Sequence, residues 1–413
     1  MLVYIRQEQE EDLLRPVLES DVPKHVITRV REEIKERETK KRKLEAHLYV
    51  TLRLHSIKEF IHYEGFDYFA HDGFRLFAEE LNDSGLQQIN LKVLRTTKLS
   101  DIFASIKETM NIPQERDVKY WKMDYRRNST LRLTQPINFE SVNITLQEAL
   151  KKEKKRTMQT QYGEEGVAST EEDDKALLET VSFLDLFIEE PYLELQFLNK
   201  LKEASLISKA QLDDELISTI RTNLPELTKG GIEPVFATDN KSNLLFVKSY
   251  DPHTQKLLGF GHFAVNQLQQ LSDISAIIED SISSNEKLTF YEEVQPGTIN
   301  EIYMKETIYD ADIDTGDIVS FEVPGAVLPD TFPVYATIKD FYSYLRYRVK
   351  LKFSKFDGSS KEYGVSNEIP ESFEFWISAY APYDDLARMV SKYAHVKPEY
   401  LKILPFILME DLC

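Results

Sequence analysis

The stretch Asp21–Val50 has the sequence DVPKHVITRVREEIKERETKKRKLEAHLYV, and its character changes along its length. Apolar residues recur at helical spacing only in its first third, at Val26, Val30 and Ile34. From Lys35 to Lys43 no residue is apolar, so this half has no face to bury, although acidic residues four positions before basic ones support a helix. We predict one charged, solvent-exposed helix over Pro23–Leu44, about 33 Å long at roughly 1.5 Å per residue.

The pattern changes after this helix, since polar and apolar residues alternate from His47 to Leu54 and predict a β-strand. A charged helix that leads into a new strand is typical of a spacer between folded units. We therefore interpret residues 7–45 as a linker. The run MLVYIR at residues 1–6 has the composition of a strand without a nearby partner. We interpret this run as the last strand of a domain whose remainder is missing.

The composition predicts a folded protein and restricts its partners. The 413 residues suffice for two to four domains, and 23 Phe and 21 Tyr can form substantial cores. The net charge of −19 argues against nucleic acid or an anionic membrane as the main partner and favours basic proteins. The single cysteine, Cys413, excludes a disulfide framework, and no apolar run is long enough to span a bilayer. We expect a soluble protein of the cytoplasm and nucleus.

A repeated order of elements defines the fold that we predict. Residues 46–190 hold strand, strand, helix, strand, turn and closing strand, the order of a β-grasp domain. The predicted elements are Leu48–Leu54, a long aromatic loop over Phe60–Phe77, Ile89–Leu94, a helix over Leu99–Met110, Val118–Trp121 and Phe183–Ile188. Residues 151–180 have almost no large apolar side chain, and we predict a disordered insertion there.

The same order of elements returns twice after a helical connector at residues 191–240. Residues 241–325 form the second copy, with strands at Leu244–Val247, Leu257–Val265, Lys287–Tyr291 and Asp317–Phe321 and a helix over Ile274–Ile282. Residues 335–413 form the third copy, with helices at Ile338–Tyr347 and Tyr383–Ala394 and strands at Arg348–Phe353, Phe373–Ile377 and Tyr400–Ile403. No closing strand follows, so we predict an incomplete third copy. The predicted fold class is α+β, with tandem β-grasp domains preceded by a long charged helix.

The sequence contains no recognisable catalytic, cofactor or metal motif. A thiol nucleophile needs a nearby histidine base, whereas Cys413 stands alone in the terminal tail. The eight histidines are scattered, and His62 and His71 are too far apart to form a metal-ligand pair. Gly259 and Gly261 lie within a predicted strand, where glycines mark a bulge more often than a phosphate-binding loop. An active thiol hydrolase is therefore the weakest of the functions that we consider.

Two charged clusters are candidate binding sites. Lys40–Lys43 could be a nuclear localisation signal, a phosphate contact or the solvated end of the charged helix. Four acidic residues stand close together just before a predicted strand: Asp310, Asp312, Asp314 and Asp317. A calcium loop needs glycine at its sixth position and a bidentate Glu at its twelfth, but Gly316 is seventh and Phe321 twelfth. Two interpretations of the acidic cluster remain: it binds a lysine-rich protein partner, or it is merely a solvated turn.

Several separate segments, in the same order, resemble the herpesvirus-associated ubiquitin-specific protease family and its fungal counterparts. MLVYIR is similar to the last strand of the family's catalytic domain, and DVPKHVITRVREE with EAHLYV to the linker that follows it. KSYDPHTQKLLGFGH and LTFYEEVQPGTINEI resemble the second of the family's five ubiquitin-like domains, and IKDFYSYLRYRVKLKF the start of the third. The resemblance implies tandem ubiquitin-like domains, with the family's catalytic cysteine and histidine boxes absent from this chain.

The resemblance also implies a partner-binding surface. The family's acidic D-E-L-M-D-G-D motif is aligned with Ala311–Asp317, where Asp312, Asp317 and Gly316 match and Ala311 and Thr315 replace acids. We expect Asp310, Asp312, Asp314 and Asp317 to bind lysine-rich partners and no cofactor to be needed. On this view the chain is the non-catalytic region of a cysteine-type deubiquitinase, which docks substrates or regulators, contacts the parent catalytic domain and meets ubiquitin only indirectly. A free-standing adaptor with ubiquitin-like modules is the alternative.

Overall fold

The computed structural model describes residues 22–69, 88–137, 143–152, 182–234, 242–282, 288–295, 297–323, 325–330, 332–354, 370 and 372–403. Three predictions lie wholly or mainly outside these ranges: the MLVYIR strand, the disordered insertion at 151–180 and the Cys413 tail. Contacts divide the chain into two compact units. Unit 1 comprises Met1–Leu52, Leu91–Phe103 and Ser141–Leu184, and unit 2 comprises Arg53–Asn90, Ala104–Glu140 and Asp185–Cys413. The described helices include none that is long and apolar enough to cross a membrane.

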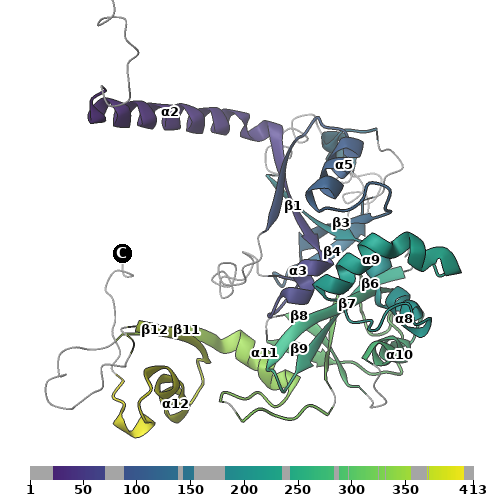
Figure 1. Cartoon of the computed structure of the whole chain (residues 1–413), viewed down its shortest axis with the longest axis vertical. Helices are drawn as coiled ribbons and strands as arrows, with labels where there is room; N and C mark the ends of the chain where they lie inside the picture. The colour runs from purple at the N-terminus through teal and green to yellow at the C-terminus, as the bar shows by residue number, and fades with distance from the viewer. Residues whose placement is uncertain are drawn as a thin grey trace, which may run out of the picture. The chain divides into compact units, whose positions relative to one another are not determined.

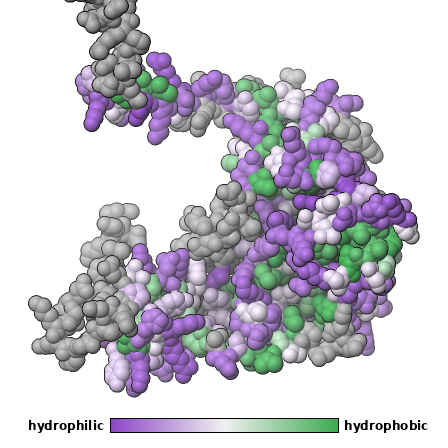
Figure 2. Space-filling view, in the orientation of Figure 1, coloured by the Kyte–Doolittle hydropathy of each residue, from purple (hydrophilic) through white to green (hydrophobic). Residues whose placement is uncertain are grey.

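Unit 1 contains the predicted charged helix. Helix α2 spans Lys24–Glu45 and is drawn as one uninterrupted rod in Figure 1, which confirms the prediction for this stretch. Hydrophilic residues dominate its surface in Figure 2. Val26, Val30 and Ile34 are 37%, 46% and 51% exposed, so the apolar stripe of the first turns is open to solvent within the described structure. Exposed ion pairs such as Arg29–Glu33, at 2.9 Å, run along the rod.

The first sheet has five strands in the order β2-β1-β5-β3-β4. Its elements, in chain order, are β1 (Tyr49–Ser56), α3 (Ile57–His62), β2 (Ile89–Leu94), α5 (Leu99–Thr109), β3 (Lys119–Tyr125), β4 (Leu131–Pro136) and β5 (Phe183–Glu189). Strand β3 pairs antiparallel with both β4 and β5. The four predicted strands and the predicted helix are present in the expected order, whereas the sequence pattern predicts neither α3 nor β4.

The second sheet repeats this arrangement in the order β7-β6-β10-β8-β9. Its elements are β6 (Ser242–Asp251), β7 (Lys256–Asn266), α10 (Leu271–Ile282), β8 (Phe290–Gln295), β9 (Thr298–Glu301) and β10 (Ile318–Glu322). Strand β10 runs parallel to β6 and antiparallel to β8. The register of β6 and β7 shifts opposite Gly259 and Gly261, which confirms the bulge that these glycines predict.

The predicted aromatic loop over Phe60–Phe77 is wrong only at its start, because Phe60–His62 belong to α3, whereas residues 63–69 form no helix or strand. Phe60 lies in α3, and it, Phe66 and Tyr68 are each 1% exposed. The rings of Phe60 and Tyr68 pack against Phe246 of β6, at centroid distances of 5.2 and 4.6 Å. Burial against a strand far away in the sequence, which no local pattern reveals, gives this segment its structure.

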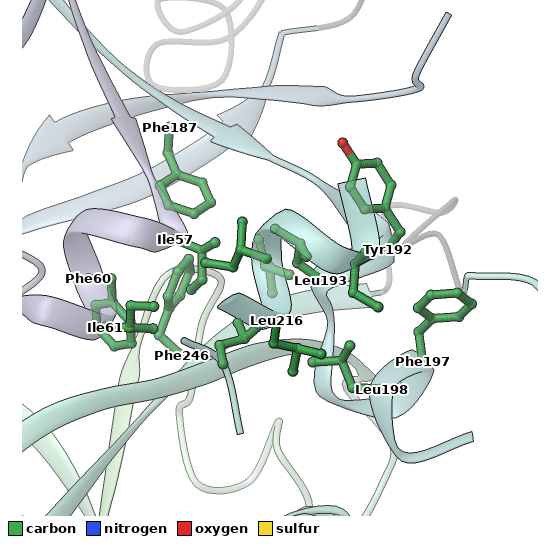
Figure 3. Close-up of a cluster of buried hydrophobic side chains, with 14 of the residues drawn as sticks. Ile57, Phe60, Ile61, Phe187, Tyr192, Leu193, Phe197, Leu198, Leu216 and Phe246 are labelled. Atoms are coloured by element: carbon green, nitrogen blue, oxygen red, sulfur yellow. The ribbon is translucent and has the colours of Figure 1, made fainter. Parts of the chain in front are cut away.

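The predicted helical connector contains η6 (Pro191–Leu193), α8 (Leu195–Glu203), α9 (Asp214–Leu227) and η7 (Thr228–Gly230). The Asp213 side chain caps α9 by accepting a hydrogen bond from the Leu216 N–H. Figure 3 shows side chains from α3, β5, α8, α9 and β6 gathered in one apolar cluster, among them Ile57, Phe187 and Phe246. The connector therefore fills a core that strands of both sheets share.

The third copy differs in part from its prediction. Helix α11 (Ile338–Tyr347), β11 (Arg348–Ser354), β12 (Ser372–Ser378) and α12 (Tyr383–Ala394) match the expected elements. The expected strand at Tyr400–Ile403 is wrong, because Pro398–Tyr400 forms the 3₁₀ turn η9 and irregular chain follows. The Tyr400 and Leu401 N–H groups donate to the Lys397 and Pro398 carbonyls within this turn, so neither is available to a strand ladder.

Candidate functional site

The acidic loop lies between Ile308, which is buried, and strand β10. Asp310, Asp312 and Asp314 are exposed. Asp310 is fixed by Thr307, whose hydroxyl donates to its carboxylate at 2.7 Å and accepts its N–H at 3.1 Å. Three of the four predicted site residues therefore present carboxylates to solvent on one short loop.

Asp317 lies behind this loop rather than on its surface. It is 3% exposed, and Arg126, in the turn between β3 and β4, donates to one carboxylate oxygen at 2.6 Å. The other oxygen accepts the Asp314 backbone N–H at 2.7 Å. Asp317 is thus an internal anchor that fixes the loop. The sequence predicts the acid but not this role, because Arg126 is distant along the chain.

The carboxylates in and beside the loop influence one another's pKa values. Desolvation and the charges of Asp317 and Asp312 raise the pKa of Asp314 above its usual value, and the Arg126 charge only partly opposes this shift. Burial and Asp317 also raise the pKa of Glu292, to about 7. Glu292 lies on β8 opposite Val319 of β10, and sequence reasoning missed it. The loop consequently carries more negative charge than Arg126 neutralises, and a cation from a partner would be favoured there.

Exposed apolar side chains border the carboxylates. Tyr309 is 71% exposed, and its N–H donates to the carbonyl of Gln267, next to Leu268, which is 76% exposed. An aromatic ring beside carboxylates suits a lysine or arginine, whose alkyl stem packs on apolar surface while its charged end reaches an acid. The arrangement can therefore bind a basic peptide segment.

A buried ionic network holds the described part of the first sheet against the second. Arg132 of β4 donates to Asp67, and its other terminal nitrogen donates to the Glu293 carbonyl at 3.2 Å. Lys248 of β6 donates to the Glu293 carboxylate at 3.0 Å and to the carbonyls of Gly65 and Asp67 at 2.8 and 2.5 Å. All four ionic side chains are at most 1% exposed. Two cations therefore balance two carboxylates in the interior.

Helix α11 joins the same network. The Tyr342 hydroxyl donates to the Glu293 carboxylate at 2.6 Å. Around it, Ile338, Phe341 and Leu345 pack in one cluster with Tyr250 and other side chains of the second sheet. The segment after α3, strands β4, β6 and β8, and α11 thus meet at one buried polar centre, which no motif in the sequence predicts.

One cavity of about 540 Å³ opens beside α9 and the segment that follows α5. Its lining includes Lys58, Arg116, Asp214 and Arg221. Lys58 pairs with Asp214 at 2.8 Å, and Arg221 pairs with Glu190 at 2.5 Å. Because these cations already have internal partners, the cavity is a weaker candidate for an anionic ligand than the acidic loop is for a basic one.

A second group of titratable residues is completely buried. The ligand atoms of Glu189, Glu194 and His262 lie within 4.8 Å of one another. Burial and the Glu189 carboxylate raise the pKa of Glu194 well above its usual value, while burial lowers the pKa of His262 to about 3. The sequence predicts no metal site, since these residues come from β5, the start of α8 and β7 and have no motif spacing. Among the described residues this trio is the arrangement that could hold a metal ion.

The fold defines a mixed α+β region with several sheets, and a family model that describes a protein-binding domain matches most of it. Residues 118–410 match the family model described as the ICP0-binding domain of ubiquitin-specific protease 7. This match covers more than half of the chain, which therefore belongs to the ubiquitin-specific protease family.

Curated relatives support the same assignment. The chain is 98% identical over 405 residues to ubiquitin carboxyl-terminal hydrolase 15 of Saccharomyces cerevisiae, covering 98% of this chain and 33% of that protein. It is 23% identical to ubiquitin carboxyl-terminal hydrolase 15 of Schizosaccharomyces pombe, covering 97% of this chain and 30% of that protein. It is also 23% identical to ubiquitin C-terminal hydrolase 12 of Arabidopsis thaliana, covering 95% of this chain and 29% of that protein. The chain spans about a third of the length of these relatives.

Proposed function

We propose that this chain is the docking region of a cysteine-type deubiquitinase, which binds substrates or regulators and positions them for ubiquitin removal. In this proposal the two five-stranded sheets are ubiquitin-like β-grasp modules. Their repeated strand order, with a helix after the second strand of each, supports this assignment. The names of the relatives support the link to deubiquitination, and the cytoplasm and nucleus remain the proposed location.

The acidic loop is the proposed contact with partners. The observation that carries this proposal is the presentation of Asp310, Asp312 and Asp314 to solvent on a loop anchored by the buried Asp317–Arg126 pair. A pre-formed loop loses little conformational entropy on binding. Its charge complements lysine-rich segments, and the net charge of −19 favours their approach.

The buried interior supports a positioning role. The apolar cluster around Phe246 and the ionic network around Glu293 join strands β4, β6 and β8 with α3 and α11. Such packed contacts resist independent movement of the elements that they join. A partner held on the acidic loop would therefore keep a defined orientation relative to the rest of unit 2.

Charge reversal on the loop tests the docking proposal. We expect the variant Asp312→Lys/Asp314→Lys to bind a lysine-rich peptide at least about tenfold more weakly, which is about 1.4 kcal/mol. The matched control is Glu108→Lys/Glu203→Lys, which changes the net charge equally at exposed helical positions that do not belong to the loop. Isothermal titration calorimetry at two salt concentrations measures both variants. Equal affinities for the two variants would remove the acidic loop as the docking site.

Asp317 is unsuitable for this test, because its substitution would break the buried pair with Arg126 as well as remove a charge. Loss of binding in an Asp317 variant would report loop collapse as readily as loss of a contact. Restricting the reversal to exposed carboxylates leaves the buried Asp317–Arg126 pair intact.

A further inference from the structure

Three side chains from separate elements converge in the interior beside the connector. Glu189 is the last residue of β5, Glu194 immediately precedes α8, and His262 lies in the middle of β7. Each is 0% exposed. Their nitrogen and oxygen ligand atoms all lie within 4.8 Å of one another.

Close packing of β7 against α8 brings these residues together. A Cβ added at Gly261 would lie 2.7 Å from the Leu195 side chain, so any larger residue would displace that side chain. His262, the next residue, stacks on Phe246 at a ring-centroid distance of 5.7 Å and meets the edge of Phe187 at 6.4 Å. The imidazole is therefore held in place by aromatic packing beside the start of α8.

Most of the polar atoms in this trio have no hydrogen-bond partner among the described residues. They are one oxygen of Glu189, both oxygens of Glu194 and both nitrogens of His262. Buried polar groups are almost always paired, so unpartnered atoms on three neighbouring side chains indicate a missing ligand. Burial and the neighbouring Glu189 carboxylate raise the pKa of Glu194, and the Lys119 charge and the Ala264 N–H only partly oppose this shift, so a bound cation would stabilise the ionised form of Glu194.

The remaining oxygen of Glu189 accepts a hydrogen bond from the Trp121 indole N–H. A donor of this kind behind a ligating carboxylate orients it and leaves its other oxygen free for a metal. Imidazole nitrogen together with carboxylate oxygen is a donor set that suits zinc, whereas magnesium and calcium prefer oxygen ligands alone. A divalent ion would also neutralise two carboxylates that lie out of contact with water.

We propose that Glu189, Glu194 and His262 form a structural binding site for one zinc ion. The second oxygen of Glu194 or a water molecule would complete the four ligands that zinc prefers. The ion would fasten the end of β5 and the start of α8 to β7, and so fix the connector on the second sheet. This site is independent of the acidic loop and of the proposed docking function.

Metal analysis of the full chain tests the proposal. The protein is stripped with chelator, dialysed against zinc and measured by elemental mass spectrometry, with Cys413→Ser as the background that excludes binding by the terminal thiol. We expect one equivalent of zinc per chain and a thermal midpoint raised by zinc but not by magnesium. Glu194→Gln and Glu189→Gln keep the side-chain volume and should each weaken zinc binding at least tenfold, while Glu203→Gln, at an exposed site, should bind as the parent does.

A spectroscopic measurement keeps the proposal testable if a variant folds poorly. Cobalt(II) at this site should quench the fluorescence of Trp121, whose indole contacts a ligand, in a background where Trp376→Phe removes the other tryptophan. Saturable quenching that zinc reverses supports the site. Zinc content below a tenth of an equivalent, or full zinc binding by both Gln variants, would overturn it and leave a shared proton or a buried water among the three side chains.

Discussion

Substitution of Lys248 by methionine tests whether the buried ionic network joins the sheets. The Lys248 ammonium is 0% exposed and donates to Glu293 and to two backbone carbonyls. Methionine keeps most of the side-chain volume but leaves the Glu293 carboxylate without this cation. Breaking one partner of a buried pair costs about 3–5 kcal/mol. We therefore expect the free energy of unfolding of unit 2 to fall by about this amount.

The same substitution at an exposed pair provides the control. Lys256 and Glu64 are 2.5 Å apart, with side chains 48% and 49% exposed. Surface pairs contribute about 0–1 kcal/mol, so Lys256→Met should change stability little. Urea unfolding followed by the fluorescence of Trp121, which is 4% exposed, measures both variants on the same scale.

A double variant separates the loss of the Lys248–Glu293 attraction from the cost of leaving a buried carboxylate unpaired. Lys248→Met/Glu293→Gln removes one charge of each sign and leaves Arg132 paired with Asp67. This variant should be more stable than Lys248→Met alone, because no uncompensated carboxylate remains in the interior. A loss below about 1 kcal/mol for Lys248→Met would refute the reasoning, since the cation would then be dispensable.

Three further substitutions test other parts of the structure. Gly259→Ala should destabilise unit 2 by about 1–3 kcal/mol in urea unfolding, because its Cβ would lie 2.3 Å from the Phe60 carbonyl oxygen, and parent-like stability would contradict the close approach. Burial lowers the pKa of His55, but hydrogen bonds to two carboxylates outweigh burial and raise the pKa above 6.5. The charged imidazole therefore stabilises the fold fully below the pKa of the unfolded state, and this stabilisation is lost as pH rises through the pKa of the folded state. His55→Gln should therefore lose more stability at pH 5.5 than at pH 8.5, whereas equal losses would argue against a charged imidazole. We expect neither the parent chain nor Cys413→Ser to turn over a ubiquitin–fluorophore substrate, and turnover that this change abolishes would establish a thiol hydrolase.

Local sequence patterns predict most elements of the fold, although they miss α3, β4 and β9. Helices α11 and α12 begin and end as their spacing predicts, since an amphipathic repeat and, for α11, a capping box of Thr337 and Asp340 act within a few residues. The charged helix α2 is predicted for the same reason, because its stability depends on neighbours along one chain segment.

Long-range contacts account for what local patterns miss. Phe60 and Tyr68 belong to a segment whose local pattern predicts only a loop, whereas in the structure both rings pack against Phe246. The acidic cluster is evident in the sequence, but the burial of Asp317 depends on Arg126 from a different sheet. Glu189, Glu194 and His262 converge only after β5, α8 and β7 have packed. Spacing along the chain carries no signal for such groups.

The most direct test of the docking account is hydrogen–deuterium exchange of the chain with and without a saturating lysine-rich peptide. The account predicts slower exchange for the backbone amides of residues 309–315, which include the exposed Asp310, Asp312 and Asp314, and no such change in the Asp312→Lys/Asp314→Lys variant. Binding of the peptide with unchanged exchange at residues 309–315 would contradict the account and place the partner elsewhere on the molecule.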